Sequence, residues 1–361
     1  MNNKYVISVM KKLNIFIFLA IYNLINQYWM KIIERIFIIF KDGDRMDFVA
    51  STGIINLDIL YGGIDNLPKE GTEVFSSSFD VQLGGGAIAS MINLKRCGVP
   101  VKLCTLVGKD KLSEVADEFL NQYELSYSNI YEGQSMPLTV TSVLITEGDR
   151  TFVSYRKDIK ISQKMKDSVY KNSIGAKIVQ IQEGFEDVYK TIKKEKPDTV
   201  FVYDTGWSDD LSIDNYRKYL EIADYYTPSA VEALKITGAS NIHDAALVLK
   251  QFLKKVVIKL SGDGCYIMDE INEYIIPSLK EFKCIDSTGA GDAFLSGMLY
   301  GLFNDFSFED CVSYGNIFGS FCVQGIGCLT SYPTVDELNI YKGRLLSDIK
   351  TVTVEDLLIY K

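Results

Sequence analysis

The segment between about residue 100 and residue 323 alternates short apolar runs with longer stretches of helical periodicity. The apolar runs lie at 101–107, 177–182, 199–203 and 256–260, and the helical stretches at 113–123, 213–223, 230–237, 291–302 and 308–323. Short buried runs separated by helices are typical of a parallel sheet that helices cover on both faces. The alternation therefore predicts an α/β protein with a doubly wound, mostly parallel sheet.

Three other segments have the period of two that half-exposed strands show. One is 73–83, and the other two, Thr139–Ile145 and Arg150–Tyr155, are separated by a short connection that contains Gly148. A glycine in so short a connection favours a β-hairpin. These segments predict a small β-sheet appended to the α/β core.

Residues 1–45 differ from the rest of the chain. Residues 15–22 are apolar and follow two lysines, as in a signal peptide, but no small-residue cleavage site comes after them. Asparagines on both sides interrupt the ~20 apolar residues that a membrane span needs. Met46 opens a segment, 46–55, that favours a buried first strand ending at Gly53. We therefore expect the fold to begin at Met46, with residues 1–45 a mistaken start or a disordered leader; a weak membrane anchor is the alternative.

Charge, cysteine content and histidine content argue against several classes of function. The formal net charge is −9, and no block of Lys and Arg indicates a nucleic-acid partner. The seven cysteines include no C-x-x-C pair, which disfavours a zinc site or a disulfide framework and favours a reducing cytoplasm. His243 is the only histidine, and its context predicts an ordinary surface residue where a helix begins.

The segment from Asp286 to Phe294 has the features of a phosphate-binding turn. Its sequence, D-S-T-G-A-G-D-A-F, places Gly289 and Gly291 directly before an apolar helix. Free N–H groups and the dipole at a helix start attract phosphate, and Asp292 could accept a proton from a hydroxyl nucleophile there. The motif predicts a phosphoryl-transfer centre with Asp292 as general base, although alone it is also compatible with a capped helix start.

A second glycine-rich turn, Gly84–Ser90, opens a helix expected over 87–97. Its glycines would let a polar ligand lie against the backbone. The turn also fits the dinucleotide pattern G-x-G-x-x-A, but the segment before it is polar and alternating where a dinucleotide fold has a buried strand. Packing of the helix against a loop is the structural alternative. The sequence has no G-x-x-x-x-G-K-[ST] motif, so a kinase would have to bind phosphate in another way.

These two motifs, in this order and about 200 residues apart, resemble those of the ribokinase-like (PfkB) carbohydrate kinases. The signature Asp-[Ser/Thr]-Thr-Gly-Ala-Gly-Asp-x-Phe is complete, and the Gly-Gly motif is present. A first-strand Gly-x-x-x-x-Asp runs from Gly53 to Asp58. The resemblance covers about 46–338. It implies a ribokinase-like kinase domain over 46–345, lid segments near 59–83 and 131–157, and a C-terminal tail at 346–361.

The resemblance implies transfer of the ATP γ-phosphoryl group to a hydroxyl of a sugar or sugar-like substrate. Asp292 would be the catalytic base, and the backbone of residues 289–292 would form the anion hole through Gly289, Ala290 and Gly291. The residues expected on the substrate are Asp58, Gly84 and Gly85, with Arg150, Phe152 and Tyr155 of the lid as further candidates for selecting it.

The resemblance also implies ATP and Mg²⁺ and, as in many members, a monovalent cation such as K⁺. Glu232 occupies the family's Asn-x-x-Glu position, which helps place Mg²⁺, and the carbonyls of Asp286 and Thr288 would bind the monovalent cation. The residues expected on the nucleotide are Ser229, Lys259, Ser261, Gly262, Gly264 and Asn316, with Gly325 and Gly327 beside the adenine. Lids of members often pair between subunits, so a cytoplasmic homodimer without a membrane or nucleic-acid partner is expected.

Three positions depart from the family pattern. Ala89 stands where most members have a sugar-binding Asn, Ser229 replaces the Asn of Asn-x-x-Glu, and Ser261 replaces a glycine of the nucleotide turn. None belongs to the predicted base or anion hole, so we expect an active kinase with an atypical substrate. The alternatives are an impaired member that binds a sugar or nucleotide as a sensor, and a Rossmann oxidoreductase, which would leave the 286–294 motif unexplained.

Overall fold

The computed structural model describes residues 47–147, 150–206 and 208–360. The predictions for residues 1–45 lie outside these ranges. Within them, no helix combines the length and the apolar character that crossing a bilayer requires.

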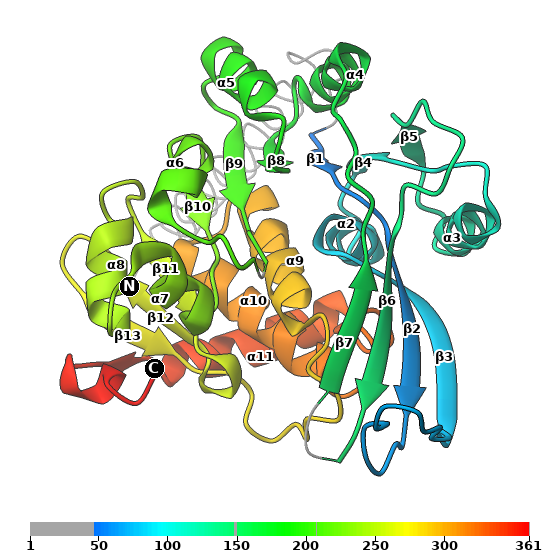
Figure 1. Cartoon of the computed structure of the whole chain (residues 1–361). Coiled ribbons are helices and arrows are strands. Elements are labelled where there is room, and N and C mark those ends of the chain that lie inside the picture. The colour runs from blue at the N-terminus through cyan, green and yellow to red at the C-terminus, as the bar shows by residue number, and fades with distance from the viewer. Residues whose placement is uncertain (1–46, 148–149, 207, 361) are drawn as a thin grey trace, which may run out of the picture. The chain divides into compact units, whose positions relative to one another are not determined.

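A six-stranded parallel sheet forms the centre of the fold, in the order β10-β9-β8-β1-β4-β5 (Figure 1). Its strands are β1 Val49–Thr52, β4 Val101–Thr105, β5 Tyr127–Asn129, β8 Ile178–Gln180, β9 Val200–Tyr203 and β10 Tyr225–Tyr226. The chain runs from β1 outward through β4 and β5, then returns to β8 on the other side of β1 and continues to β9 and β10. The direction of winding therefore reverses at β1, and the carboxyl end of such a strand is where open α/β sheets bind ligands.

Two apolar cores cover the two faces of this sheet. Neighbouring residues of one strand enter different cores: Val49 and Val202 pack in the first, and Ala50 and Phe201 in the second. The first core contains α2 Gly86–Arg96, α3 Lys111–Gln122, α9 Ala290–Phe303, α10 Phe308–Cys322 and α11 Val335–Ser347. The second contains α4 Gln163–Ser173, α5 Glu186–Glu195, α6 Ile213–Leu220, α7 Ala230–Thr237 and α8 Ile242–Leu249. The predicted doubly wound α/β fold is confirmed.

An antiparallel sheet continues the fold beyond β10. It consists of β11 Val256–Lys259, β12 Cys265–Met268, β13 Glu273–Ile276 and β14 Lys350–Thr351. The Lys259 N–H donates to the Pro228 carbonyl at 2.8 Å, which joins β11 to the segment after β10. Residues 346–360 end α11, add β14 to this sheet and bury Leu357, the last residue of the short helix η2 Glu355–Leu357.

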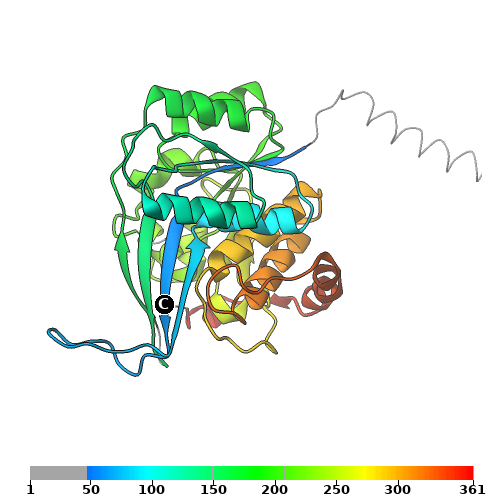
Figure 2. The same cartoon turned by 90° about the vertical axis from the view of Figure 1, so that its right-hand side faces the viewer.

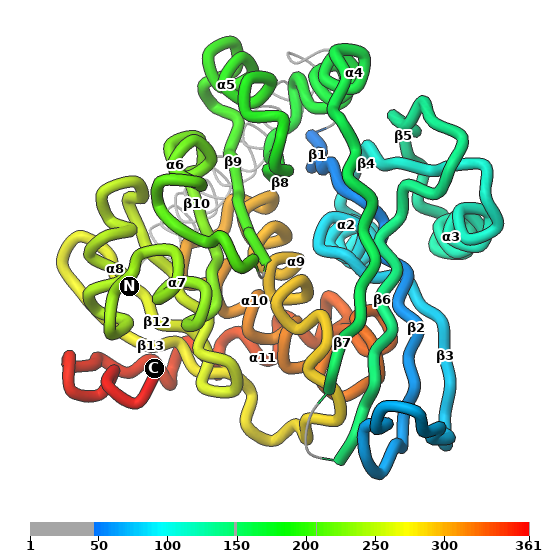
Figure 3. Tube along the Cα trace, viewed as in Figure 1, coloured from blue at the N-terminus to red at the C-terminus, as the bar shows by residue number. Residues whose placement is uncertain are grey.

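A separate four-stranded sheet forms the lid, in the order β3-β2-β6-β7. Its strands are β2 Asn56–Gly62, β3 Ser78–Gly84, β6 Thr139–Ile145 and β7 Arg150–Tyr155. Figures 2 and 3 show these strands side by side, extending from the α/β core. The hairpin prediction is confirmed, because Ile145 pairs with Arg150 across an antiparallel ladder. The strand expected over 73–83 begins only at Ser78, since the exposed residues before it have no ladder partner.

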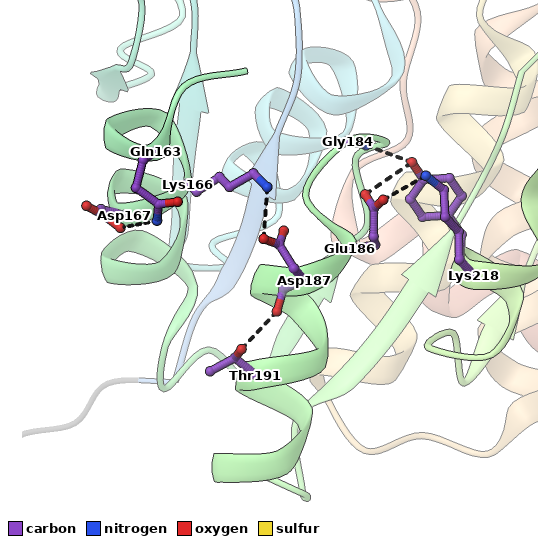
Figure 4. A network of polar contacts seen from close by, with 9 residues as sticks. Gln163, Lys166, Asp167, Gly184, Glu186, Asp187, Thr191 and Lys218 are labelled. Carbon is purple, nitrogen blue, oxygen red and sulfur yellow. Dashed lines mark hydrogen bonds and ion pairs between the residues drawn. The ribbon is translucent and has the colours of Figure 1, made fainter. Parts of the chain in front are cut away.

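Polar contacts tie the helices of the second core together near the loop that follows β8 (Figure 4). Lys166 of α4 pairs with Asp187 of α5 at 2.8 Å, and Glu186 of α5 pairs with Lys218 of α6 at 2.7 Å. The Gly184 N–H donates to the Tyr219 hydroxyl at 2.8 Å. Exposed ion pairs contribute only about 0–1 kcal/mol each, so their main consequence is to fix the start of α5 relative to its neighbours.

Candidate active site

The first turn of α9 is the turn that the 286–294 motif predicts. Gly289 caps the helix with φ 76°, in the left-handed region. A Cβ at this glycine would lie 2.0 Å from the Cβ of Cys328. Only glycine can therefore hold this backbone against the neighbouring loop. The Lys259 ammonium lies 3.3 Å from the position of a Cβ on Gly291, so a cation that is mostly shielded from solvent adjoins this helix start.

The Asp286 carboxylate holds the loop before α9 in place. One oxygen accepts from the Thr288 N–H at 2.9 Å and from its hydroxyl at 2.7 Å. The other oxygen accepts from the Gly327 N–H at 2.9 Å. Asp286 thus joins the two loops that border the start of α9. Its carboxylate is used in these contacts, and the group predicted to bind a cation is its backbone carbonyl.

Asp292 lies where the two glycine-rich motifs meet. Its Oδ1 lies 2.9 Å from the position of a Cβ on Gly86, the first residue of α2. Burial raises the pKa of Asp292 to about 7, with a further contribution from Asp204; the ammonium of Lys259 acts in the opposite direction. A carboxyl group with a pKa near neutrality can act as a base toward a hydroxyl at physiological pH.

Asp58 approaches the same region from β2 of the lid sheet. It is 5% exposed, and its Oδ2 lies 2.2 Å from the position of a Cβ on Gly84. The Asn56 amide donates to Oδ1 of Asp58 at 2.6 Å. Burial, together with the negative charge of Asp286, raises the pKa of Asp58 to about 6. The predicted substrate residues Asp58, Gly84 and Gly85 are therefore adjacent, and Gly85 caps α2.

Lys259 is held by a partly buried ion pair that the sequence reasoning did not include. Its ammonium lies 3.2 Å from Oδ1 of Asp204, which also accepts from the Thr227 hydroxyl at 3.0 Å. Burial alone would lower the pKa of Lys259, but the carboxylates of Asp204 and Glu232 outweigh it and raise that pKa. Lys259 therefore stays cationic beside the start of α9.

Ser229 and Glu232 form a reciprocal cap at the start of α7. The Ser229 N–H donates to Glu232 Oε2 at 2.7 Å, and the Glu232 N–H donates to the Ser229 hydroxyl at 3.3 Å. This capping box satisfies two helix-start donors. Serine at this position keeps Glu232 fixed, so the substitution of the family's Asn does not release the predicted metal residue.

The predicted nucleotide turn follows β11 as the short helix η1 Ser261–Asp263. Ser261 has φ 54° and Gly264 φ 101°, so both occupy left-handed conformations. The Lys280 ammonium donates to the Gly262 carbonyl at 2.6 Å and closes the turn. The glycine that the family usually has at position 261 would adopt this conformation without strain, whereas the backbone of Ser261 is strained.

Asn316 serves the interior of the protein. Its Nδ2 donates to the carbonyls of Ile276 at 2.9 Å and Pro277 at 3.1 Å, and its Oδ1 accepts from the Cys265 thiol. These contacts fix the end of β13. The place of Asn316 beside the adenine stays a prediction. Its side-chain amide would contribute there by holding the backbone of Ile276 and Pro277 in position.

The lid candidates divide between the two faces of the lid sheet. Asp58 pairs with Thr141, and Thr141 with Ser154, so these side chains share one face. Arg150 and Phe152 lie on that face because residues two apart point the same way. The Arg150 guanidinium donates to the Ser287 hydroxyl of the loop before α9. Tyr155 lies on the opposite face, so its predicted part in selecting the substrate does not fit the geometry.

Sequence reasoning missed Asp204 and Gln180, which follow or end buried strands of the central sheet. Asp204 comes directly after β9, and Gln180 is the last residue of β8. A polar residue at the carboxyl end of a buried strand is the signal that could have found both. His243, expected on the surface, is half-buried in α8 and contacts Glu273 at 2.9 Å, away from these groups.

A family model described as pfkB family carbohydrate kinase matches residues 46–335. The chain belongs to this family. A nucleoside kinase of Methanocaldococcus jannaschii is 24% identical over 300 residues, which are 82% of this chain and 97% of the relative. A 2-dehydro-3-deoxygluconokinase of Bacillus subtilis is 23% identical over 77% of this chain and 89% of the relative.

The fold agrees with the family. A ribokinase of Arabidopsis thaliana, solved with ribose and ATP, superposes with a TM-score of 0.70 at 20% identity, covering 82% of this chain and 99% of that one. The protein is accordingly a carbohydrate kinase with a hydroxyl group as acceptor.

Proposed function

We propose that this kinase transfers the γ-phosphoryl group of ATP to a sugar or nucleoside hydroxyl, with Asp292 as general base and the backbone of residues 289–292 as anion hole. The observation that carries the proposal is the position of Asp292. Its carboxylate lies at the first turn of α9, against the start of α2. Burial, Asp204 and Asp58 raise its pKa to about 7, while the charge of Lys259 lowers it. The carboxylate thus lies next to Gly86 of the substrate motif, on the helix turn that follows the glycines of the proposed anion hole.

On the acceptor side, Asp58 and the backbone of Gly84 and Gly85 would bind the substrate hydroxyls. Asn56 orients the Asp58 carboxylate, and the Thr141 hydroxyl in turn donates to the side-chain Oδ1 of Asn56 at 3.1 Å. Ala89 of α2 is fully buried, and its methyl side chain has no polar group that could bind the substrate. Acceptor recognition would therefore depend on Asp58 and on the lid face that carries Arg150.

On the donor side, the N–H groups of Gly289, Ala290 and Gly291 would hold the transferring phosphoryl group, and Lys259 would stabilise the negative charge that accumulates on it. Ser229, Ser261, Gly262, Gly264 and Asn316 would border the nucleotide. The carbonyls of Asp286 and Thr288 would hold a monovalent cation such as K⁺ near the anion hole.

The residues near Glu232 fit a magnesium–nucleotide complex. The carboxylates of Asp204, Glu232 and Asp292 act together on Lys259, and the Glu232 Oε1 lies outside the capping box. No cluster of three or more His, Cys, Asp or Glu forms a protein-only metal site in the ranges that the structure describes. Mg²⁺ usually uses one or two carboxylates besides phosphate and water, and it would supply charge neutralisation to the phosphates.

ATP-dependent phosphorylation across a panel of sugars and nucleosides tests the proposal. On the best acceptor, we expect Asp292→Asn to lower kcat by roughly 10²–10⁴-fold, as loss of a general base does. The matched control is Asp336→Asn, another acidic residue in the first turn of a helix, which is exposed on α11. Full turnover by Asp292→Asn would contradict the assignment of the base.

We also propose a homodimer that pairs through the outer face of the lid. This face carries apolar side chains exposed to solvent, among them Phe79 at 62%, Val153 at 64% and Tyr155 at 55%. It points away from Asp58, because these residues alternate with those of the substrate face. A second copy of the lid would bury them without blocking the active site.

A further inference from the structure

Gln180 ends β8 at the carboxyl edge of the central sheet, beside the strand where the winding reverses. It is 6% exposed, and the two residues before it in the strand are apolar. Its Oε1 accepts a hydrogen bond from the Ser51 hydroxyl of β1 at 3.0 Å. The strand pairing of β1 and β8 places these residues directly opposite each other, so the contact is built into the sheet.

The contact with Ser51 leaves the NH₂ group of Gln180 directed toward α2. Its Nε2 lies 4.0 Å from the position of a Cβ on Gly86, and Asp292 Oδ1 lies 2.9 Å from that same position. Gly86 thus leaves open the space that the amide and the carboxylate share. Within the described part of the chain, neither Nε2 of Gln180 nor the Asp292 carboxylate has a hydrogen-bond partner.

We propose that Gln180 is a positioning residue for the catalytic base: when the acceptor is bound, its Nε2 donates a hydrogen bond to the Asp292 carboxylate across the space that Gly86 leaves open, and Ser51 fixes the amide in the orientation that makes this possible. The proposal rests on the proposed function of Asp292. It gives the carboxylate one oxygen held by the protein and one directed at the acceptor hydroxyl.

The surroundings of Asp292 explain why a neutral donor matters there. The charged and titratable groups that act on it are Asp58 of β2, Asp204 after β9, Glu232 of α7, Lys259 of β11, and the thiols of Cys322 and Cys328. The three carboxylates disfavour the ionised form of Asp292, and Lys259, which favours it, already contacts Asp204. A hydrogen bond to the charged form of Asp292 favours the deprotonated base.

The test is the pH dependence of kcat in Gln180→Met, which keeps the length of the side chain and removes the amide. We expect the acidic limb to move upward by about one pH unit, so kcat falls about tenfold at pH 6 and less than about twofold at pH 9. KM for the acceptor should stay within about twofold. Ser51→Ala should move the limb in the same direction by less, and Gln163→Met, at an exposed glutamine of α4, should not move it.

Gln180→Glu is the second variant, because it has the same shape and can still accept from Ser51. The added negative charge should raise the acidic limb further, and this variant carries the test if Gln180→Met fails to fold in a thermal melt. An equal loss of kcat at every pH, or a rise in KM alone, would overturn the proposal. If Asp292→Asn retained full turnover, the proposed function of Asp292 would fail. If Asp292→Asn lost turnover but the acidic limb of the pH–kcat profile did not move in either Gln180 variant, only the positioning role of Gln180 would fail.

Discussion

Asp292 combines a catalytic requirement with a cost in stability. The group must lose its proton to act as a base, yet burial and Asp204 raise its pKa to about 7. We therefore expect kcat to fall about tenfold per pH unit below pH 7 and to level off above it. A pH–rate profile of the wild-type enzyme measures this, and an acidic limb near pH 4 would contradict it.

The same pKa shift predicts that Asp292→Asn stabilises the protein while it lowers kcat. A folded-state pKa raised above the unfolded value contributes stability that is fully present below about pH 4 and is lost as pH rises through about 7. Asparagine removes the buried charge, so the free energy of unfolding at pH 8 should increase by on the order of 2 kcal/mol. Chemical denaturation at pH 8 and pH 4 checks this; the gain should be absent at pH 4.

Among the elements, the start of α9 depends most on a single backbone conformation. Gly289→Ala should cost more than about 2 kcal/mol, because alanine disfavours the left-handed region and its Cβ would overlap Cys328. The anion hole would also shift, so kcat should fall at least tenfold in the folded fraction. Steady-state kinetics beside denaturant unfolding separates the two effects.

Gly238 provides the matched control for Gly289. It caps α7 with φ 69°, and a Cβ there would meet no heavy atom within 4 Å. Gly238→Ala should therefore cost only about 1 kcal/mol and leave kcat unchanged. If both variants lost the same stability and both kept kcat, the contact with Cys328 would have no part in the site.

The nucleotide turn offers a substitution that should stabilise the fold. Ser261 has φ 54°, a conformation that costs a non-glycine residue roughly 1 kcal/mol. Ser261→Gly should therefore raise the free energy of unfolding by up to about 1 kcal/mol, less the extra flexibility of glycine in the unfolded chain. Thermal unfolding measures the change, and a clear decrease would mean that the Ser261 side chain holds the turn.

For single helices and strands, prediction from the sequence succeeded where a local pattern determines where the element begins and ends. The helix at 230–237 and both strands of the β6–β7 hairpin have their predicted limits, because their signals lie within the segment. β12 and β13 were not predicted although they form a local hairpin, since each has only four residues. β14 was not predicted because its ladder joins β13 to a segment far along the sequence. Gln180 was missed for the same reason: only the pairing of β1 with β8 shows that it contacts Ser51.

For the whole molecule, the arrangement of the sheets explains how one site is assembled from distant segments. β2 leaves the carboxyl end of β1 and carries Asp58 into the lid, while α2 and α9 pack side by side in the first core and bring Gly86 to Asp292. The two motifs could be paired from sequence through the family resemblance alone. Their contact requires the packing of two helices about 200 residues apart, which no local pattern contains.

The lid sheet also determines what the molecule should do in solution. Its outer face presents Val153 and Tyr155 to solvent, and contiguous exposed apolar side chains of this kind mark interaction surfaces. We expect light scattering with size-exclusion chromatography to give twice the chain mass at micromolar concentration. Val153→Glu should shift the equilibrium toward monomer by at least tenfold in Kd, because dimerisation would bury the new charge.

Ile271→Glu is the control for this change, since Ile271 is 89% exposed on the turn between β12 and β13, outside the lid sheet. It should leave the mass unchanged. Because Val153 points away from Asp58, the monomeric variant should still bind ATP, whereas its KM for the acceptor should rise if the partner lid steadies the substrate face. A wild-type monomer, or a dimer that survives Val153→Glu, would place the interface elsewhere.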